Sequence, residues 1–98
     1  MMQLSVTPRA ITDLSEILDY IQQQNPSAAI DIEQGFWREF DFLCEFPNTG
    51  HVRKDAGGSR YRFQCLKSYV ICYRIEDHKL RILRILHGAR DFRQIEFE

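Results

Sequence analysis

The chain has 98 residues, 44% of them hydrophobic, which is enough for one domain with a single core and leaves little room for a second. That composition is typical of globular proteins and excludes a disordered chain. The formal net charge is only −1, but residues 1–50 carry two basic and eight acidic side chains, whereas residues 51–98 carry eleven basic and six acidic ones. The second half therefore suits an anionic partner, or its charges are simply solvated.

The spacing of the cysteines and histidines and the length of the apolar runs argue against a disulfide-rich, metal-binding or membrane-spanning protein. The three cysteines show no Cys-x-x-Cys spacing, and the three histidines are scattered. We therefore expect no disulfide framework, no metal site and no cofactor. No apolar run approaches the roughly 18 residues of a membrane span, and the first residues lack a signal-peptide pattern. The sequence predicts a cytoplasmic protein that does not enter a membrane.

The first elements are a strand and a helix. Residues 3–7 alternate as a short strand does, and Thr7-Pro8 has the form of an N-cap followed by the first helical residue. The helix extends to about Gln24. Its apolar residues at helical spacing are Ile11, Leu14, Ile17, Leu18 and Ile21.

A second helix begins directly after the first. Asn25-Pro26 repeats the cap-and-proline signal, and the helix closes before Pro47. Because the connection is so short, the two helices must form an antiparallel hairpin. The apolar stripe of this helix is Ala29, Ile32, Phe36, Phe40 and Leu43. Trp37 and Phe42 lie off that stripe, so they require a second surface, either a sheet of the same chain or a partner protein.

The sequence of the C-terminal half predicts a loop followed by three strands. Residues 46–59 contain glycines and no apolar period, which indicates a loop. Residues 59–65, 68–75 and 79–88 have strand patterns, and their short links favour an antiparallel meander. The order β-α-α-β-β-β defines an α+β fold in which the N-terminal helical hairpin packs on a twisted antiparallel sheet. We expect residues 1–98 to form this single domain.

Local motifs for catalysis are weak. The sequence has no recognisable nucleophile triad and no glycine-rich phosphate loop. A metal-independent ribonuclease remains open, because basic side chains, histidine and tyrosine can orient a 2′-hydroxyl and stabilise a phosphorane-like transition state. Its candidate residues are Lys54, Arg60, Arg62, Arg84, His87 and Arg90.

Arginines on the predicted strands define a candidate anion-binding face. Arg60 and Arg62 share one face of their strand, and if the last strand is its neighbour, a basic sheet face results. Ion pairs with acidic residues of the helices are an equally good interpretation of each arginine. Arg81 and Arg84 differ by an odd number, so they point to opposite faces unless a bulge intervenes. In a regular strand Arg84 shares its face with Leu80, Ile82 and Leu86.

The exit of the last strand carries further charged groups. Gly88 lets the chain turn out of the sheet, which places His87 and Arg90 at the strand's end. Asp91 is an alternative, purely structural partner for Arg90.

Several segments, taken in order, resemble one bacterial family. "LSVTPRAITDLSEILDYI" contains P-x-A-x-x-D-L-x-x-I-x-x-Y-I, "NPSAAIDI" opens the second helix and "LCEFPNTG" closes it. "SYVICYRI" is a central strand, and "LRILRILHGARDF" fits V-x-I-x-R-V-x-H-x-x-R-D. Together they resemble the ParE branch of the ParE/RelE toxin superfamily of type II toxin–antitoxin systems.

The resemblance implies a fold, a partner and two alternative activities. Superfamily members share a helical hairpin on a curved antiparallel sheet. A cognate ParD-like antitoxin typically wraps its C-terminal segment around the toxin and neutralises it, which implies a hetero-oligomer. Such a segment would lie along the apolar surface near Trp37 and Phe42 or add a strand to a sheet edge. ParE-type members tend to poison DNA gyrase, whereas RelE-type members cleave mRNA on the ribosome.

Departures from the RelE pattern favour the first activity. RelE-type catalysis draws on sheet-face basic residues, here matched at or near Arg60, Arg62, Arg84 and Arg90, and on a tyrosine near the C-terminus. No tyrosine follows Tyr73. The resemblance therefore favours a non-catalytic gyrase inhibitor, with a ribosome-dependent mRNA endoribonuclease as the alternative. The candidate residues for binding target or antitoxin are Arg60, Arg62, Arg84, His87, Arg90, Trp37 and Phe42.

Overall fold

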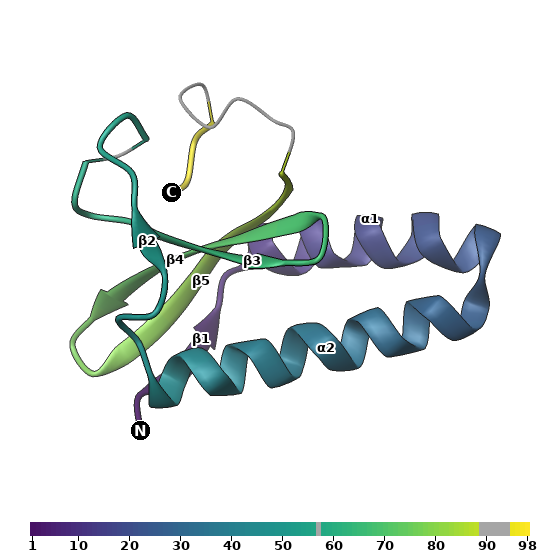
Figure 1. Ribbon diagram of the computed structural model, residues 1–98, viewed down its shortest axis with the longest axis horizontal. Helices are drawn as coiled ribbons and strands as arrows, with labels where there is room; N and C mark the ends of the chain where they lie inside the picture. The colour runs from purple at the N-terminus through teal and green to yellow at the C-terminus, as the bar shows by residue number, and fades with distance from the viewer. Residues whose placement is uncertain (57, 89–94) are drawn as a thin grey trace.

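The computed structural model describes residues 1–56, 58–88 and 95–98, and the predicted site residue Arg90 lies outside these ranges. Within them, two helices pack on a five-stranded sheet, which confirms the α+β fold (Figure 1). The elements in chain order are β1 (Gln3–Val6), α1 (Pro8–Gln24), α2 (Pro26–Glu45), β2 (His51–Val52), β3 (Arg62–Leu66), β4 (Tyr69–Glu76) and β5 (Lys79–His87).

The strands of the described chain are arranged in the order β1-β5-β4-β3-β2. The predicted meander is confirmed, because β3, β4 and β5 pair in antiparallel fashion. The sheet as a whole is mixed, however, since β1 pairs with β5 in parallel. A parallel pair requires a long crossover connection, and the helical hairpin with the strands that follow it supplies one. β1 thereby places the start of α1 beside the middle of β5.

Two local features of the sheet were resolved only by the structure. The predicted loop 46–59 contains the short strand β2, which pairs with Arg62 and Phe63 of β3. The turn between β4 and β5 has positive φ at Asp77 and His78, as a two-residue type I′ hairpin turn requires. Neither residue is glycine, which explains why the sequence shows no strong hairpin signal there.

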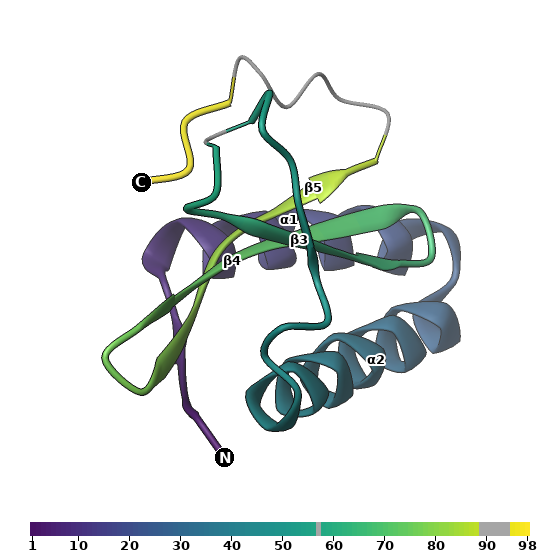
Figure 2. The ribbon, with the colours of Figure 1, turned by 60° about the vertical axis from the view of Figure 1, so that its left-hand side comes forward.

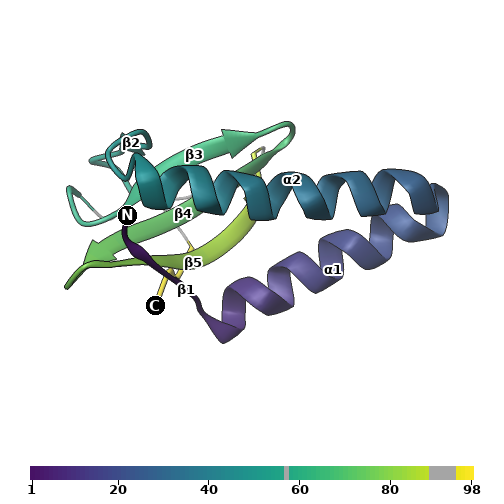
Figure 3. The ribbon, with the colours of Figure 1, turned by 90° about the horizontal axis from the view of Figure 1, so that it is seen from below.

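The helices begin where the sequence predicts. Thr7 Oγ1 accepts a hydrogen bond from the backbone N–H of Ala10 at 3.2 Å, and Asn25 Oδ1 accepts one from that of Ala28 at 3.2 Å. The Thr7 hydroxyl also donates to the carbonyl oxygen of Leu83 at 3.1 Å, which ties the start of α1 to β5. The two helices lie side by side as an antiparallel hairpin across one face of the sheet (Figure 3). In the described part of the chain, neither is long and apolar enough to span a membrane.

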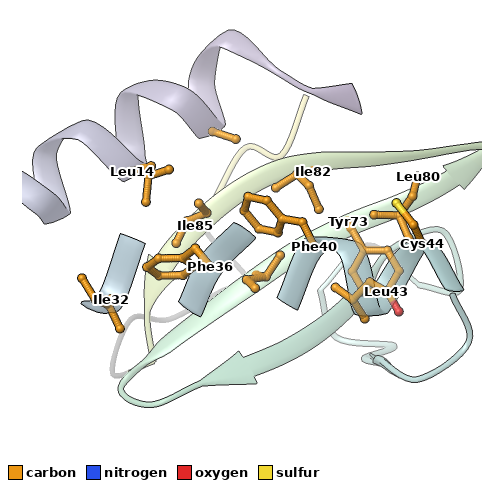
Figure 4. Close-up of a cluster of buried hydrophobic side chains, with 12 residues drawn as sticks. Leu14, Ile32, Phe36, Phe40, Leu43, Cys44, Tyr73, Leu80, Ile82 and Ile85 are labelled. Carbon is orange, nitrogen blue, oxygen red and sulfur yellow. The ribbon is translucent and has the colours of Figure 1, made fainter. Parts of the chain in front are cut away.

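The helix-facing side of the sheet carries the larger cluster of buried side chains. Figure 4 shows Phe36 and Phe40 of α2 directed toward the sheet, with Leu14 of α1 above them. The predicted α2 stripe is buried throughout, whereas Ile11, at the margin of the α1 stripe, remains 45% exposed. The buried members of this cluster are Ala10, Leu14, Ile32, Phe36, Phe40, Leu43, Cys44, Ile71, Tyr73, Leu80, Ile82 and Ile85.

The opposite side, here called the outer face, also buries apolar side chains. Phe97 returns across this face and packs against Tyr61 and Phe63, with ring centroids 5.0 and 5.6 Å away. In Figure 2 the yellow C-terminal segment lies above the sheet and α2 lies below it. The buried members of the outer-face cluster are Ala56, Tyr61, Phe63, Val70, Cys72, Leu83, Leu86 and Phe97. Burial on both faces explains why the central strand β4 is apolar along most of its length.

A bulge in β5 changes which residues share a face. Cys72 pairs with Arg84 whereas Tyr73 pairs with Ile82, so Leu83 is the additional residue of β5. Because directly paired residues point to the same side of a sheet, Arg84 lies on the outer face with Cys72 and not with Ile82. The expectation that Arg84 shares its face with Leu80 and Ile82 is therefore wrong. The bulge places Arg84 on the same face as Arg81, which pairs with the outer-face residue Arg74.

Candidate functional site

Arg84 is a structural residue that joins the sheet to α1. Its Nε and Nη2 atoms donate to the two carboxylate oxygens of Asp13 at 2.7 and 3.1 Å, and its Nη1 donates to the carbonyl oxygen of Glu96 at 3.0 Å. The backbone N–H of Ile85 donates to the same carboxylate at 3.0 Å. The Arg84 and Asp13 side chains are only 10% and 13% exposed, and the hydrogen bonds to Asp13 raise the pKa of Arg84 above its ordinary value.

Arg62 holds the turn that follows α2. Its Nη1 donates to the carbonyl oxygens of Gly50 and Asn48 at 2.8 and 3.3 Å. The Tyr73 hydroxyl supports the same turn by donating to the Pro47 carbonyl at 2.6 Å and accepting from the Gly50 N–H at 2.8 Å. Burial raises the pKa of the Tyr73 phenol, so it remains a neutral donor at physiological pH. Arg62 therefore faces the loop after α2 and not an open sheet surface.

The predicted basic sheet face does not form among the described residues. β4 separates β3 from β5, and Arg62 and Arg84 lie on opposite faces of the sheet. Arg60 is exposed just before β3, with its guanidinium carbon 5.7 Å from the centre of the Tyr61 ring. Lys54 is exposed in the loop after β2. The structure therefore does not gather the basic candidates into one site.

His87 lies at a groove between α1 and the end of β5. Its ring meets Tyr69 edge to face at 5.9 Å between centroids. The groove has a volume of about 440 Å³, and Tyr20 at its rim is 63% exposed. Its lining residues are Asp13, Glu16, Ile17, Tyr20, Tyr69, Ile85, Leu86 and His87.

The exposed side of α2 carries large apolar side chains. Trp37 is 38% exposed, and its ring is nearly perpendicular to the Phe40 ring, with the centroids 5.3 Å apart. Phe42 is 42% exposed and contacts Phe46, with the centroids 5.1 Å apart. The sheet of the same chain therefore covers neither Trp37 nor Phe42 fully. Trp37 and Phe42 are five positions apart, about 140° around the helix axis, so they flank the buried stripe of α2 on its two sides. Exposed aromatic side chains of this kind are typical of protein–protein contact sites.

A polar cluster on the outer face was not predicted from the sequence. The Glu98 carboxylate accepts a hydrogen bond from the Tyr61 hydroxyl at 2.7 Å and two from Arg74 Nη1 at 2.7 and 2.8 Å. Arg81 Nη1 lies 3.9 Å from the same carboxylate. The Tyr61 hydrogen bond and Arg74 hold the pKa of Glu98 below its ordinary value, and burial raises that of Tyr61. No local pattern in the sequence indicates this cluster, because Glu98 lies 24 positions away from Arg74 along the chain.

Side chains that could bind a metal ion are dispersed over the part of the chain that the structure describes. Across residues 1–56, 58–88 and 95–98, His, Cys, Asp and Glu side chains nowhere form a group of three or more that could hold a metal ion. Cys72 is a buried thiol whose pKa is raised by desolvation.

Fold and surfaces together define a small α+β protein with a helical hairpin on one face of its sheet and exposed aromatic side chains on that hairpin. Residues 4–92 match the family model described as the ParE toxin of the type II toxin–antitoxin system parDE. The chain therefore belongs to the ParE toxin family.

Two individual proteins agree with this assignment. The chain is 36% identical over 90 residues to Toxin RelE2 of Caulobacter vibrioides, covering 92% of this chain and 99% of that protein. It is also similar to a solved structure titled "Chromosomal ParDE TA system from P. aeruginosa", with a TM-score of 0.75 and 26% identity. That alignment covers 89% of this chain and 96% of the other.

Proposed function

We propose that this toxin inhibits DNA gyrase by binding it, and that a cognate ParD-like antitoxin neutralises it. Membership of the ParE family supports this proposal, as does the solved relative from a ParDE system. The observation that carries it is the position of the arginines. Arg62 and Arg84 are the strand arginines expected in a catalytic centre, and both are engaged in bonds that stabilise the fold.

A ribonuclease requires its acid, base and charge-stabilising groups to converge on one phosphate. Arg62 bonds to the turn after α2, whereas Arg84 is on the opposite face and reaches over the sheet edge to Asp13. The exposed candidates Arg60 and His87 belong to different ends of the sheet, since one precedes β3 and the other ends β5. An inhibitor that acts by binding does not need such convergence. The described residues therefore favour binding over RNA cleavage.

The exposed aromatic side chains along α2 and at its C-cap residue Phe46, here called the aromatic surface of α2, are the best-supported contacts for the antitoxin. Trp37, Phe42 and Phe46 remain exposed although each is large enough to contribute substantially to an interface. An amphipathic segment of the antitoxin that folds on binding would cover them. This arrangement would supply the second surface that these side chains require.

Two assays with the purified toxin test the choice of target. We expect the toxin to inhibit DNA supercoiling by gyrase in proportion to its concentration, and the antitoxin to reverse this inhibition. We expect ribosome-bound mRNA to remain intact at the same toxin concentrations. Cleavage of mRNA with unchanged supercoiling would overturn the proposal and establish the endoribonuclease alternative.

Substitutions on α2 test the antitoxin surface. We expect Trp37→Ser and Phe42→Ser each to weaken antitoxin binding by roughly 10- to 100-fold, because buried aromatic anchors commonly contribute about 2 kcal/mol or more. Tyr20→Ser is the matched control, since Tyr20 is an exposed aromatic residue on α1. Affinities can be compared by isothermal titration calorimetry, with circular dichroism to confirm that each variant is folded. Unchanged affinity in both α2 variants would exclude this surface.

A further inference from the structure

The segment 95–98 makes a continuous set of contacts with the outer face. Ile95 packs against the outer-face cluster, and the carbonyl oxygen of Glu96 accepts a hydrogen bond from Arg84 at 3.0 Å. Phe97 is only 7% exposed and lies against the rings of two aromatic residues. Glu98 then meets Tyr61, Arg74 and Arg81. Each residue of the segment thus makes a different kind of contact.

These contacts are those with which a protein surface recognises a peptide. An aromatic pocket receives a ring, a guanidinium binds a main-chain carbonyl, and an arginine with a tyrosine hydroxyl binds a carboxylate. We propose that this surface is a docking site for an extended peptide with an aromatic residue followed directly by an acidic one. The chain's own Phe97 and Glu98 occupy the site in cis, so a partner segment of the same chemistry must displace them.

The contacts that the site makes indicate a peptide ligand and not a nucleic acid. A phosphate would use Arg74 and Tyr61, and a base would stack on the aromatic rings, but neither requires the donor that Arg84 directs to a main-chain carbonyl. The spacing of the three contacts over consecutive residues matches a polypeptide backbone. Because Glu98 is held in its ionised form by Tyr61 and Arg74, the acidic position of the peptide is specified by charge.

Occupation in cis makes the site a regulated one. A tethered segment competes at an effective concentration in roughly the millimolar range, so a partner peptide binds the intact protein more weakly than a protein whose own segment is released. The site is separate from the aromatic surface of α2, and its proposed role depends on neither gyrase nor antitoxin. The outcome of its test is therefore independent of whether the proposed function is correct.

A peptide titration tests the site directly. The Phe97→Ser/Glu98→Gln double variant weakens both anchors of the cis segment while leaving its receiving residues unchanged. The probe is the acetylated peptide Ile-Glu-Phe-Glu, titrated into isotope-labelled protein and followed by the backbone amide resonances of Phe63, Arg74 and Arg81. We expect saturable shifts in the double variant, with a dissociation constant at least about tenfold lower than in the unaltered protein.

Controls separate recognition from general charge attraction. The matched peptide Ile-Gln-Ser-Gln is expected to produce no saturable shift. Adding Arg74→Gln to the double variant is expected to weaken binding of the acidic peptide by at least about tenfold, because the carboxylate loses its closest cation. If the double variant does not give a folded spectrum, Glu98→Gln alone replaces it, since that variant retains the buried Phe97 ring.

Either of two results would overturn the inference as a whole, and a third would overturn the acidic specificity of the site. One is the absence of saturable shifts with Ile-Glu-Phe-Glu in a folded variant. The other is binding of a short single-stranded oligonucleotide, but not of the peptide, at the same amide resonances, which would assign the site to nucleic acid. Shifts produced equally by the acidic and the neutral peptide would also contradict the recognition of the carboxylate.

Discussion

Replacing Asp13 by alanine is expected to lower the free energy of unfolding by about 3–5 kcal/mol. The Asp13 carboxylate accepts two hydrogen bonds from the Arg84 guanidinium and one from the Ile85 N–H. Its removal leaves a cation that is only 10% exposed without a countercharge, and it leaves a backbone donor of β5 without its acceptor. The effect should be measured by urea denaturation.

An exposed acidic residue of the same helix provides the control. Asp19→Ala is expected to change the free energy of unfolding by less than about 0.5 kcal/mol, because surface substitutions of this kind rarely have larger effects. The double variant Asp13→Leu/Arg84→Met is expected to recover part of the loss, since it removes the buried charge together with its partner. Equal stabilities of Asp13→Ala and Asp19→Ala would show that the ion pair does not stabilise the fold.

Gly50→Ala is expected to destabilise the protein by about 1–3 kcal/mol through overpacking. An added Cβ atom would lie 2.6 Å from the Tyr73 hydroxyl oxygen and 2.7 Å from its Cε1 atom. The Tyr73 ring is completely buried and its hydroxyl is bonded to Pro47 and Gly50, so it cannot move aside without breaking the turn after α2. Thermal unfolding followed by circular dichroism measures the loss.

Another glycine gives a matched comparison. Gly35 lies inside α2, and an added Cβ atom would make only an ordinary contact of 3.8 Å with Leu66. Gly35→Ala should therefore stabilise the protein by up to about 1 kcal/mol, because alanine is the better helix former. A Gly50→Ala variant as stable as the unaltered protein would contradict the close packing at Tyr73.

Features that depend on neighbouring residues were predicted well from the sequence. The N-caps Thr7 and Asn25 are confirmed, and so are the boundaries of both helices within one or two residues. A cap depends on a side chain and a backbone N–H three residues later, and a buried stripe depends on the period of the helix. Both relations can be read along the chain without knowledge of the fold.

Features that depend on distant residues were not predicted. The bulge at Leu83 reverses the face of Arg84, and nothing in the local alternation of β5 indicates where the extra residue falls. Asp13 pairs with Arg84, 71 positions further along the chain, which is the kind of ion pair that the sequence left open as the alternative for each strand arginine without indicating the acidic partner. The contact of Glu98 with Arg74 likewise joins residues from separate parts of the sequence. Candidate site residues chosen by charge alone therefore included arginines that stabilise the fold.

The bonds from Thr7 and Asp13 to β5 have a consequence for self-association. β1 pairs with β5 only as far as Ile82, so the sheet would otherwise present a bare backbone edge over the following residues. The Thr7 hydroxyl and the Asp13 carboxylate take the place of a further strand by bonding to Leu83 and Ile85. The same bonds that hold α1 against the sheet therefore also cover the exposed backbone edge of β5. Any fluctuation that lifts this helix away creates a template on which a second molecule can add a strand.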